Sequence, residues 1–277
     1  MKIVTGEFGQ GLHSFAPVVV VQDIVHIEDE KHDDSSLSPR ISATRRTTLD
    51  LVGALIIDSS DPLAWEEGRG VALDALKAGH SIIMPTDTVY GIACDAFSPS
   101  AVNALLAHKG RGRHMPPPVL VASPDDATRL SHSVPAEATA LMADFWPGGV
   151  TVILEASPDV DWDLGETGGT VAIRMPNHPV ALDLLTESGP LAVSSANLTG
   201  QHSSVTVAEA YEQFGDTLPV YIDAGLVGHA YADAPGNPGS TIIDATAVSS
   251  GGPWRVVRHG VVPWEELRAV VGGEWEQ

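Results

Sequence analysis

The chain has 277 residues, of which 43% are hydrophobic and 18% are charged, and its formal net charge is -21. This composition can bury a core, and no apolar run reaches the ~20 residues that cross a bilayer. With no apolar secretory signal and a single cysteine, we expect a soluble cytoplasmic protein. The acidic balance argues against a broad nucleic-acid surface but permits a small anion held by a few cations.

The first 60 residues differ in composition from the remainder. The run 18–21 predicts a short strand, and the polar stretch that follows it to Thr48 cannot bury much apolar surface. We expect residues 1–60 to be a partly mobile N-terminal extension and residues 61–277 to be the catalytic domain. The pattern leaves open whether 51–57 packs on that domain.

From residue 61 on, helix and strand signals alternate along the chain. Predicted helices cover 64–78, 98–110, 135–145, 179–187, 206–215 and a short segment after Pro263, and Ser123 begins a capping box. Predicted strands cover 81–84, 119–122, 150–154, 170–173, 191–194, 220–222, 241–243 and 255–257. This alternation indicates an α/β fold with a mostly buried sheet flanked by helices.

Three polar loops carry the residues that could perform chemistry. They are Pro85-Thr86-Asp87-Thr88, the basic segment 109–113 and Ser194-Ser195-Ala196-Asn197. We expect each to lie where a strand ends, because ligands of open α/β sheets collect there. Taken singly, each loop is better explained by turn and capping hydrogen bonds.

Cations gather beside these loops in an otherwise acidic chain. Of the 15 Lys and Arg residues, a third lie on the basic loop or at strand ends: Lys109, Arg111, Arg113, Arg174 and Arg258. This concentration predicts one local anion-binding place. The P-loop motif, a complete dinucleotide fingerprint and histidine pairs with metal-ligand spacing are all absent, so we expect no protein-bound metal. Cys94 is expected to be a core residue.

The order of six segments resembles one known family. PTDTVYG, KGRGRHMPPPVLV, WPGGVTVIL, VAIRMPNHP, SSAN and STIIDAT follow one another, over about residues 64–262, as in the YrdC-like threonylcarbamoyl-AMP synthases. The resemblance implies a short-form enzyme with a twisted mixed sheet around a concave, cationic cleft. It also implies a nucleotidyltransferase that makes L-threonylcarbamoyladenylate from L-threonine, bicarbonate and ATP, releases pyrophosphate and serves threonylcarbamoyladenosine modification of tRNA.

The resemblance also implies roles for particular residues. The K-x-R pair, Lys109 and Arg111, would be catalytic. The resemblance implies that ATP is bound by Arg111, Thr170, Asn197 and Arg258. It implies that threonine is bound by Thr88, Arg174, Ser195 and Ser240. Guanidinium groups suit phosphate and carboxylate, which they can hold bidentately. Mg²⁺ is expected with the triphosphate, and transferase proteins and tRNA are expected as downstream, indirect partners, with no membrane partner.

Two positions depart from the family pattern. Gly112 stands where a proline is usual, which favours a more flexible loop, and Met115 stands where a side-chain amide would contact the nucleotide. The leading 60 residues have no counterpart in the short family members, and we expect a short form without the extra C-terminal domain of the longer members.

Two other functions remain open from the residues alone. The first is an RNA- or nucleotide-binding module of the same fold without synthase activity, although the acidic balance argues against double-stranded RNA. The second is a carbamoyl-adenylate-forming domain of a hydrogenase-maturation protein, which the lack of any C-x-x-C pair disfavours.

Overall fold

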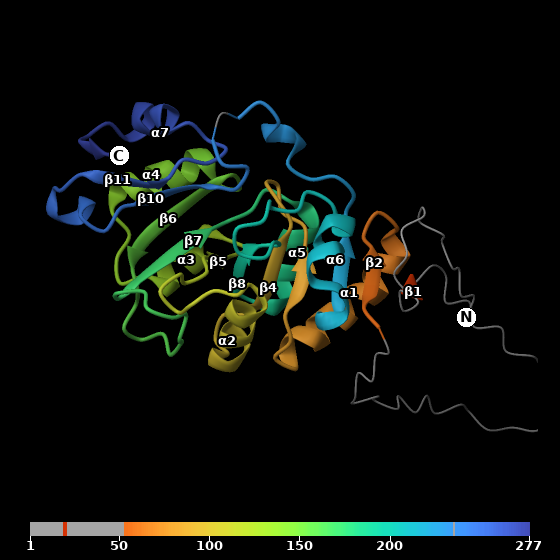
Figure 1. Ribbon diagram of the computed structural model, residues 1–277. Helices are drawn as coiled ribbons and strands as arrows, with labels where there is room; N and C mark the ends of the chain where they lie inside the picture. The colour runs from red at the N-terminus through yellow and green to blue at the C-terminus, as the bar shows by residue number, and fades with distance from the viewer. Residues whose placement is uncertain (1–18, 21–52, 235) are drawn as a thin grey trace, which may run out of the picture.

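The computed structural model describes residues 19–20, 53–234 and 236–277 (Figure 1). The strands within these residues are β1 (Val19–Val20), β2 (Leu55–Asp58), β3 (Ile82–Met84), β4 (Gly91–Asp95), β5 (Val119–Leu120), β6 (Val150–Glu155), β7 (Thr170–Arg174), β8 (Leu191–Ser195), β9 (Val220–Asp223), β10 (Thr241–Asp244), β11 (Trp254–Arg258) and β12 (Trp275–Glu276). The helices are α1 (Pro62–Lys77), α2 (Pro99–His108), α3 (Pro124–Leu130), α4 (Ala136–Phe145), α5 (Pro179–Ser188), α6 (Val207–Phe214) and α7 (Trp264–Val271). Short 3₁₀ turns are η1 (Gly215–Thr217), η2 (His229–Tyr231) and η3 (Val248–Ser250).

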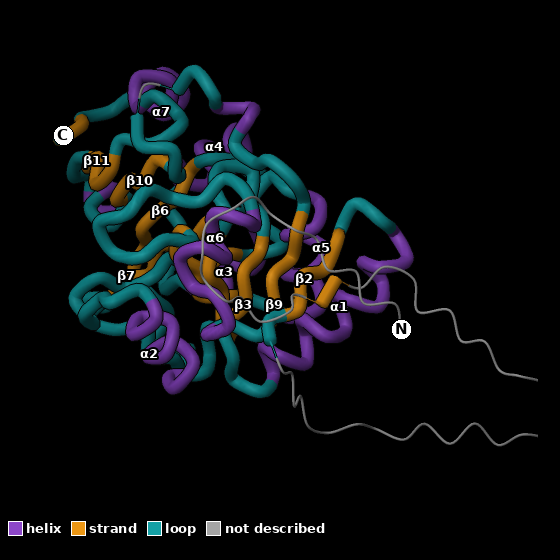
Figure 2. The backbone as a smooth tube through the Cα atoms, turned by 45° about the vertical axis from the view of Figure 1, so that its right-hand side comes forward, coloured by secondary structure: helices purple, strands orange, loops and turns teal. Residues whose placement is uncertain are grey.

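The described strands form one mixed sheet in the order β1-β2-β9-β3-β4-β8-β5-β7-β6-β10-β11-β12. β2 and β9, β5 and β7, and β6 and β10 pair in parallel, whereas β4 runs antiparallel to both β3 and β8. Helices flank the strands on both sides (Figure 2). The predicted α/β class with a mixed, helix-flanked sheet is confirmed. No helix within the described residues is both long and apolar enough to cross a bilayer.

The helices begin where the sequence indicates, because their caps are built locally. The Asp61 side chain accepts a hydrogen bond from the backbone N–H of Leu63 at the start of α1. Ser98 caps α2, and the reciprocal capping box predicted at Ser123 is formed with Asp126. Each predicted helix and strand after residue 61 is present, with small shifts at the ends.

Part of the segment assigned to the N-terminal extension belongs to the sheet. Leu55–Asp58 forms β2, which pairs with β9 from Leu55 opposite Val220 to Asp58 opposite Asp223. Ile57 is buried against α1. The question left open for residues 51–57 is therefore settled for 55–57, which pack on the domain. Residues 1–18 and 21–52 of the predicted extension lie outside the described residues.

The two faces of the sheet are covered to different extents. One face packs against buried residues of α2, α3, α4, α6 and α7 and forms the larger core. The other face packs against α1 and α5, and this smaller core draws its strand residues from β2, β9, β3, β4, β8 and β5. Among the described residues, β6, β7, β10 and β11 contribute none to it. The smaller core, with the described helices α1 and α5, therefore does not extend beyond β5 on this face.

The side chains of β6 and β7 alternate between the two faces of the sheet. In β6 and β7, Val152, Leu154, Val171 and Ile173 are buried in the larger core. Of the alternate positions, Ile153, Thr170 and Ala172 are partly exposed and Glu155 is exposed, whereas Thr151 and Arg174 are buried. Ile153 lies opposite Ala172 on this open face. Arg174 lies opposite Leu120 of the smaller core, so its side chain is at the border between the covered and the open parts of the face.

Candidate active site

The loop after β3 is organised by the hydroxyl of Thr86. It donates to the carbonyl of Val89 at 2.6 Å and accepts from the N–H of Thr88 at 3.2 Å and of Val89 at 3.3 Å. For Thr86, therefore, the turn explanation is correct. The turn leaves the carboxylate of Asp87 and the hydroxyl of Thr88 available to a guanidinium group that comes from another strand.

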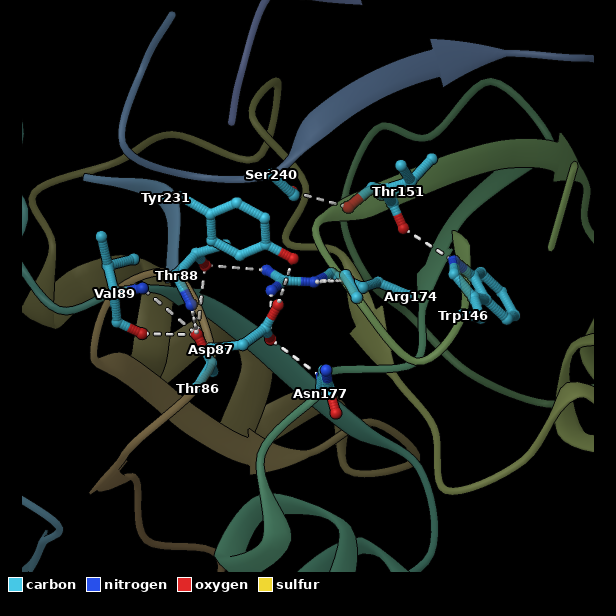
Figure 3. Close-up of polar contacts among 12 residues, drawn as sticks. Thr86, Asp87, Thr88, Val89, Trp146, Thr151, Arg174, Asn177, Tyr231 and Ser240 are labelled. Atoms are coloured by element: carbon cyan, nitrogen blue, oxygen red, sulfur yellow. Dashed lines mark hydrogen bonds and ion pairs between the residues drawn. The ribbon is translucent and has the colours of Figure 1, made fainter. Parts of the chain in front are cut away.

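Arg174 joins this loop to the far half of the sheet (Figure 3). Its Nη2 donates to Asp87 Oδ1 at 2.6 Å, its Nη1 donates to Thr88 Oγ1 at 3.1 Å, and its Nε donates to the carbonyl of Gly148 at 2.9 Å. The side chain is only 7% exposed. Of the five N–H bonds of a guanidinium, three are used, so one on each terminal nitrogen remains for a ligand.

Lys109 is buried, and its ammonium group is held by the S-x-N loop. The residue is 1% exposed. Its Nζ donates to the carbonyls of Ser195 and Asn197, the second at 2.7 Å. The backbone carbonyl of Lys109 in turn accepts from the hydroxyl of Thr199 at 2.7 Å. Burial, with a smaller effect of Arg111, lowers the pKa of Lys109 to about 7.

Three cations of this region converge. Arg111 donates from Nη1 to the hydroxyl of Ser194 at 3.1 Å, and its buried Nε has no partner among the described residues. Arg258 donates from Nε and Nη2 to the carbonyl of Ser240 at 3.0 and 2.7 Å. Burial, followed by the charges of Arg174 and Arg111, lowers the pKa of Arg258 to about 10. Arg111 and Arg174 are thus close enough to Arg258 to repel it.

The hydroxyl and amide groups of the other predicted site residues are tied to nearby groups. Ser195 donates to the side-chain oxygen of Asn197, whose amide nitrogen donates to the carbonyls of Leu198 and Gln201. The hydroxyls of Ser240 and Thr151 share a hydrogen bond of 2.7 Å. The structure thus connects Thr88 with Arg174, Lys109 with Ser195 and Asn197, and Ser240 with Arg258.

Thr170 lies apart from these groups. It begins β7, and its hydroxyl donates to the carbonyl of Thr167 at 2.8 Å. It shares the open face of β7 with Arg174, but four residues of strand, at ~3.3 Å each, separate the two positions. Its predicted place beside ATP remains a prediction that would require a ligand extending along this face.

The basic loop differs from the prediction in two respects. It follows helix α2 and not a strand, because α2 extends to His108. Its third cation, Arg113, does not join the cluster. Its guanidinium points to the surface, where it donates to Asn103 at 2.7 Å and pairs with Asp163. The carboxylate compensates this charge, so only Lys109 and Arg111 of the loop contribute to the cation cluster.

Sequence reasoning did not assign roles to two residues of the site. Asp87 lies in a quoted motif, and a carboxylate next to a predicted threonine-binding hydroxyl could have been recognised as a partner for Arg174. It also accepts from the backbone N–H of Asn177 at 2.9 Å. Tyr231, whose hydroxyl donates to Asp87 Oδ2 at 3.3 Å, comes from a segment without a recognisable pattern.

Comparison with known proteins places the chain in a family. The model of the Sua5/YciO/YrdC family, described as telomere recombination, matches residues 74–260. The chain belongs to the Sua5/YciO/YrdC family. The matched range contains each predicted site residue, and it confirms the resemblance drawn from the six segments.

Relatives and solved structures agree with this membership. A protein of Mycobacterium tuberculosis is 46% identical over 215 residues, which cover 78% of this chain and 94% of the relative. The threonylcarbamoyl-AMP synthase of Rattus norvegicus is 33% identical and covers 86% of this chain and 82% of its own length. The crystal structure of Pyrococcus abyssi Sua5 complexed with L-threonine has a TM-score of 0.71 at 30% identity, over 81% of this chain and 63% of that chain.

In this member of the Sua5/YciO/YrdC family, the K-x-R and S-x-N pairs touch each other. The ammonium of Lys109 lies on the carbonyls of both Ser195 and Asn197. Among the described residues, no group of three His, Cys, Asp or Glu side chains is placed to hold a metal ion. The groups that the site offers to a ligand are therefore cations, hydroxyls and backbone N–H groups.

Proposed function

We propose that this chain is a threonylcarbamoyl-AMP synthase, an ATP-dependent nucleotidyltransferase that serves the threonylcarbamoyladenosine modification of tRNA. Its substrates would be L-threonine, bicarbonate and ATP, and its products L-threonylcarbamoyladenylate, pyrophosphate and the water released when the amine and bicarbonate form the carbamate. Family membership supports the activity, and so does the similarity to the threonylcarbamoyl-AMP synthase of Rattus norvegicus. The similarity to Pyrococcus abyssi Sua5, which was crystallised in complex with L-threonine, supports L-threonine as the amino acid.

The observation that carries the proposal is a group of cations without counter-charges, of which Lys109 is buried and Arg111 and Arg258 are partly buried. Lys109, Arg111 and Arg258 form no ion pair with a carboxylate among the described residues, although the chain is strongly acidic. Holding such groups close together without an anion is costly. A triphosphate, with its Mg²⁺ held mostly by phosphate and water, would compensate them.

The geometry divides the site into two parts. Arg174, with two unused N–H bonds beside Thr88, would hold the carboxylate of threonine. Arg111 and Arg258 would face the phosphates of ATP, and Lys109 would fix the S-x-N loop between them. The carbamate of threonine would then attack the α-phosphorus, and the bond to the β-phosphate oxygen would break. Alignment and charge neutralisation supply the catalysis, so no protein nucleophile is required.

The test is an assay of the purified chain with ATP and Mg²⁺. We expect pyrophosphate release and a mass corresponding to threonylcarbamoyladenylate only when both threonine and bicarbonate are supplied. Turnover of ATP that is indifferent to threonine would contradict the proposal. The alternative, a binding module without synthase activity, would give ligand binding and no adenylate; no observation on this chain favours it. We further propose that the product passes to transferase proteins acting on tRNA in the cytoplasm.

A further inference from the structure

Tyr231 reaches the proposed amino-acid subsite from a segment that belongs to no strand. The connection from β9 to β10 carries η2; its described residues, 224–234 and 236–240, run in blue along the top of the molecule in Figure 1. The Tyr231 hydroxyl donates to one oxygen of Asp87, while the other oxygen accepts from Arg174 (Figure 3). The phenol therefore lies beside the groups that would hold the substrate carboxylate.

Close backbone contacts fix the position of this ring. Gly228 has a φ of +79°, and a Cβ there would lie 2.4 Å from the carbonyl oxygen of Thr88, so the segment rests directly on the loop after β3. The N–H of Val227 donates to the carbonyl of Val205 at 3.0 Å. A Cβ on Gly149 would lie 3.3 Å from the phenol of Tyr231, which packs against that glycine. The ring is held from both sides.

Tyr231 lines two neighbouring pockets. The smaller, of about 200 Å³, includes Thr88, and the other residues of its wall are mostly small or β-branched, such as Val205, Val227 and Ala234. The larger, of about 350 Å³, has Phe145 and Val262 in its wall. Only Tyr231 and Val261 are common to both walls, and the phenol ring of Tyr231 is the larger of these two side chains.

We propose that Tyr231 is a specificity-determining residue that limits the size of the amino-acid side chain the enzyme accepts. This inference rests on the proposed synthase function. A short, β-branched side chain fits the apolar cavity with its polar group toward the Thr88 hydroxyl, whereas a longer chain meets the phenol ring. Removing the ring joins the two cavities and admits a longer side chain.

The experiment compares Tyr231→Ala with Tyr231→Phe, using pyrophosphate release and product mass with L-threonine and with L-leucine. In Tyr231→Ala we expect the ratio of kcat/KM for threonine to that for leucine to fall at least tenfold, the discrimination that a few methylene groups supply in a pocket. Tyr231→Phe keeps the ring but loses the hydrogen bond to Asp87. Its KM for threonine therefore rises, while its ratio of kcat/KM for threonine to that for leucine stays at the wild-type value. The matched control is Tyr211→Phe on α6, which loses a 3.0 Å hydrogen bond to Asp216 and changes neither quantity.

Tyr231→Val also removes the phenol ring, and it is used if the alanine variant does not fold, as judged by thermal melting. If a folded variant without the ring keeps the wild-type ratio of kcat/KM for threonine to that for leucine, the inference is overturned. A wild-type chain that forms no adenylate with threonine would instead overturn the proposed function, so the two failures are distinguishable.

Discussion

The ammonium of Lys109 lies in an unusual place for a group so strongly hydrated in water. It is fully enclosed, satisfied by two backbone carbonyls, and unaccompanied by a carboxylate among the described residues. Since burial favours the neutral amine, the folded chain binds this proton more weakly than the unfolded chain does. The free energy of unfolding must then depend on pH through this one side chain.

We predict that Lys109→Met removes a pH dependence of stability. Below pH 7 the amine is protonated in both states, and the cost of burying its charge is present in full. Between about pH 7 and the ordinary value near 10.5, the folded chain has lost the proton and the unfolded chain has kept it, so the free energy of unfolding rises with pH. Urea unfolding from pH 6.5 to 9.5 would measure this slope.

Lys77→Met, at an exposed position of α1, serves as the control and keeps the slope. Lys109→Met also leaves two buried carbonyls without a donor, which lowers stability by roughly 1–3 kcal/mol at the pH where the wild type is most stable. A slope that persists in Lys109→Met would show that another group causes it.

At this scale, some residues named from the motifs are in contact, while their roles in binding remain predictions. Lys109 contacts Ser195 and Asn197, and Thr88 contacts Arg174. The motifs could not show that the lysine donates to carbonyls, because side-chain spacing does not reveal backbone acceptors. Arg113 was grouped with the other cations because its partner Asp163 is 50 residues away in sequence.

Helix α1 shows how two glycines of one element can differ. Gly68 faces the sheet, and a Cβ there would lie 2.2 Å from a methyl group of the buried Ile57. Gly70 is exposed, and a Cβ there would meet nothing within 4 Å. The first glycine allows α1 to approach β2, whereas the second only weakens the helix.

We therefore predict opposite effects of two alanine substitutions. Gly70→Ala raises the free energy of unfolding by up to about 1 kcal/mol through helix propensity. Gly68→Ala lowers it, because overpacking costs roughly 1–3 kcal/mol and exceeds the same propensity gain. Thermal and urea unfolding of the two variants check this prediction. Equal stabilisation by both substitutions would contradict the close packing of Gly68 in α1 against Ile57 in β2.

Elements with clear caps or apolar runs could be predicted, and elements without them could not. α1, α2 and α3 each carry a capping side chain and a proline in the first turn. β4 was missed because Gly91, Ala93 and Cys94 give no alternation and form strands weakly. Its residues are nearly all buried because both faces of the sheet are covered at β4: Ile92 and Cys94 lie in the larger core and Ala93 in the smaller one. This burial is a property of the sheet and not of the segment.

Over the whole molecule, net charge and local charge have opposite signs. The chain carries a net -21, yet the described site holds arginines close enough to repel one another. A ligand that binds only the folded chain stabilises it by about 2.7 kcal/mol at a hundred times its Kd. A polyanion that fits the cations should therefore stabilise the free protein.

We predict that inorganic tripolyphosphate raises the Tm at constant ionic strength, by several degrees at saturating concentration. Arg258→Gln and Arg111→Gln reduce this shift because each removes one of the cations. Arg255→Gln, an exposed position on the same strand that pairs with Asp244, leaves the shift intact. Equal shifts in all three variants would mean that the anion binds elsewhere. The composition predicted a local anion site, but only the fold shows which cations are left without carboxylates.

The sheet has a further consequence beyond β5, where α1 and α5 no longer cover it. There the strands that pack the larger core on one side are open on the other, so the shape of the open side is set by the architecture of the interior. The connection between β9 and β10 lies outside the strands, but Val227 belongs to the larger core and Gly228 rests on the loop after β3. The proposed selectivity is thereby assigned to one side chain on an anchored connection, so a change at Tyr231 can alter the size of the subsite while the strands that carry Arg174 and Arg258 keep their places.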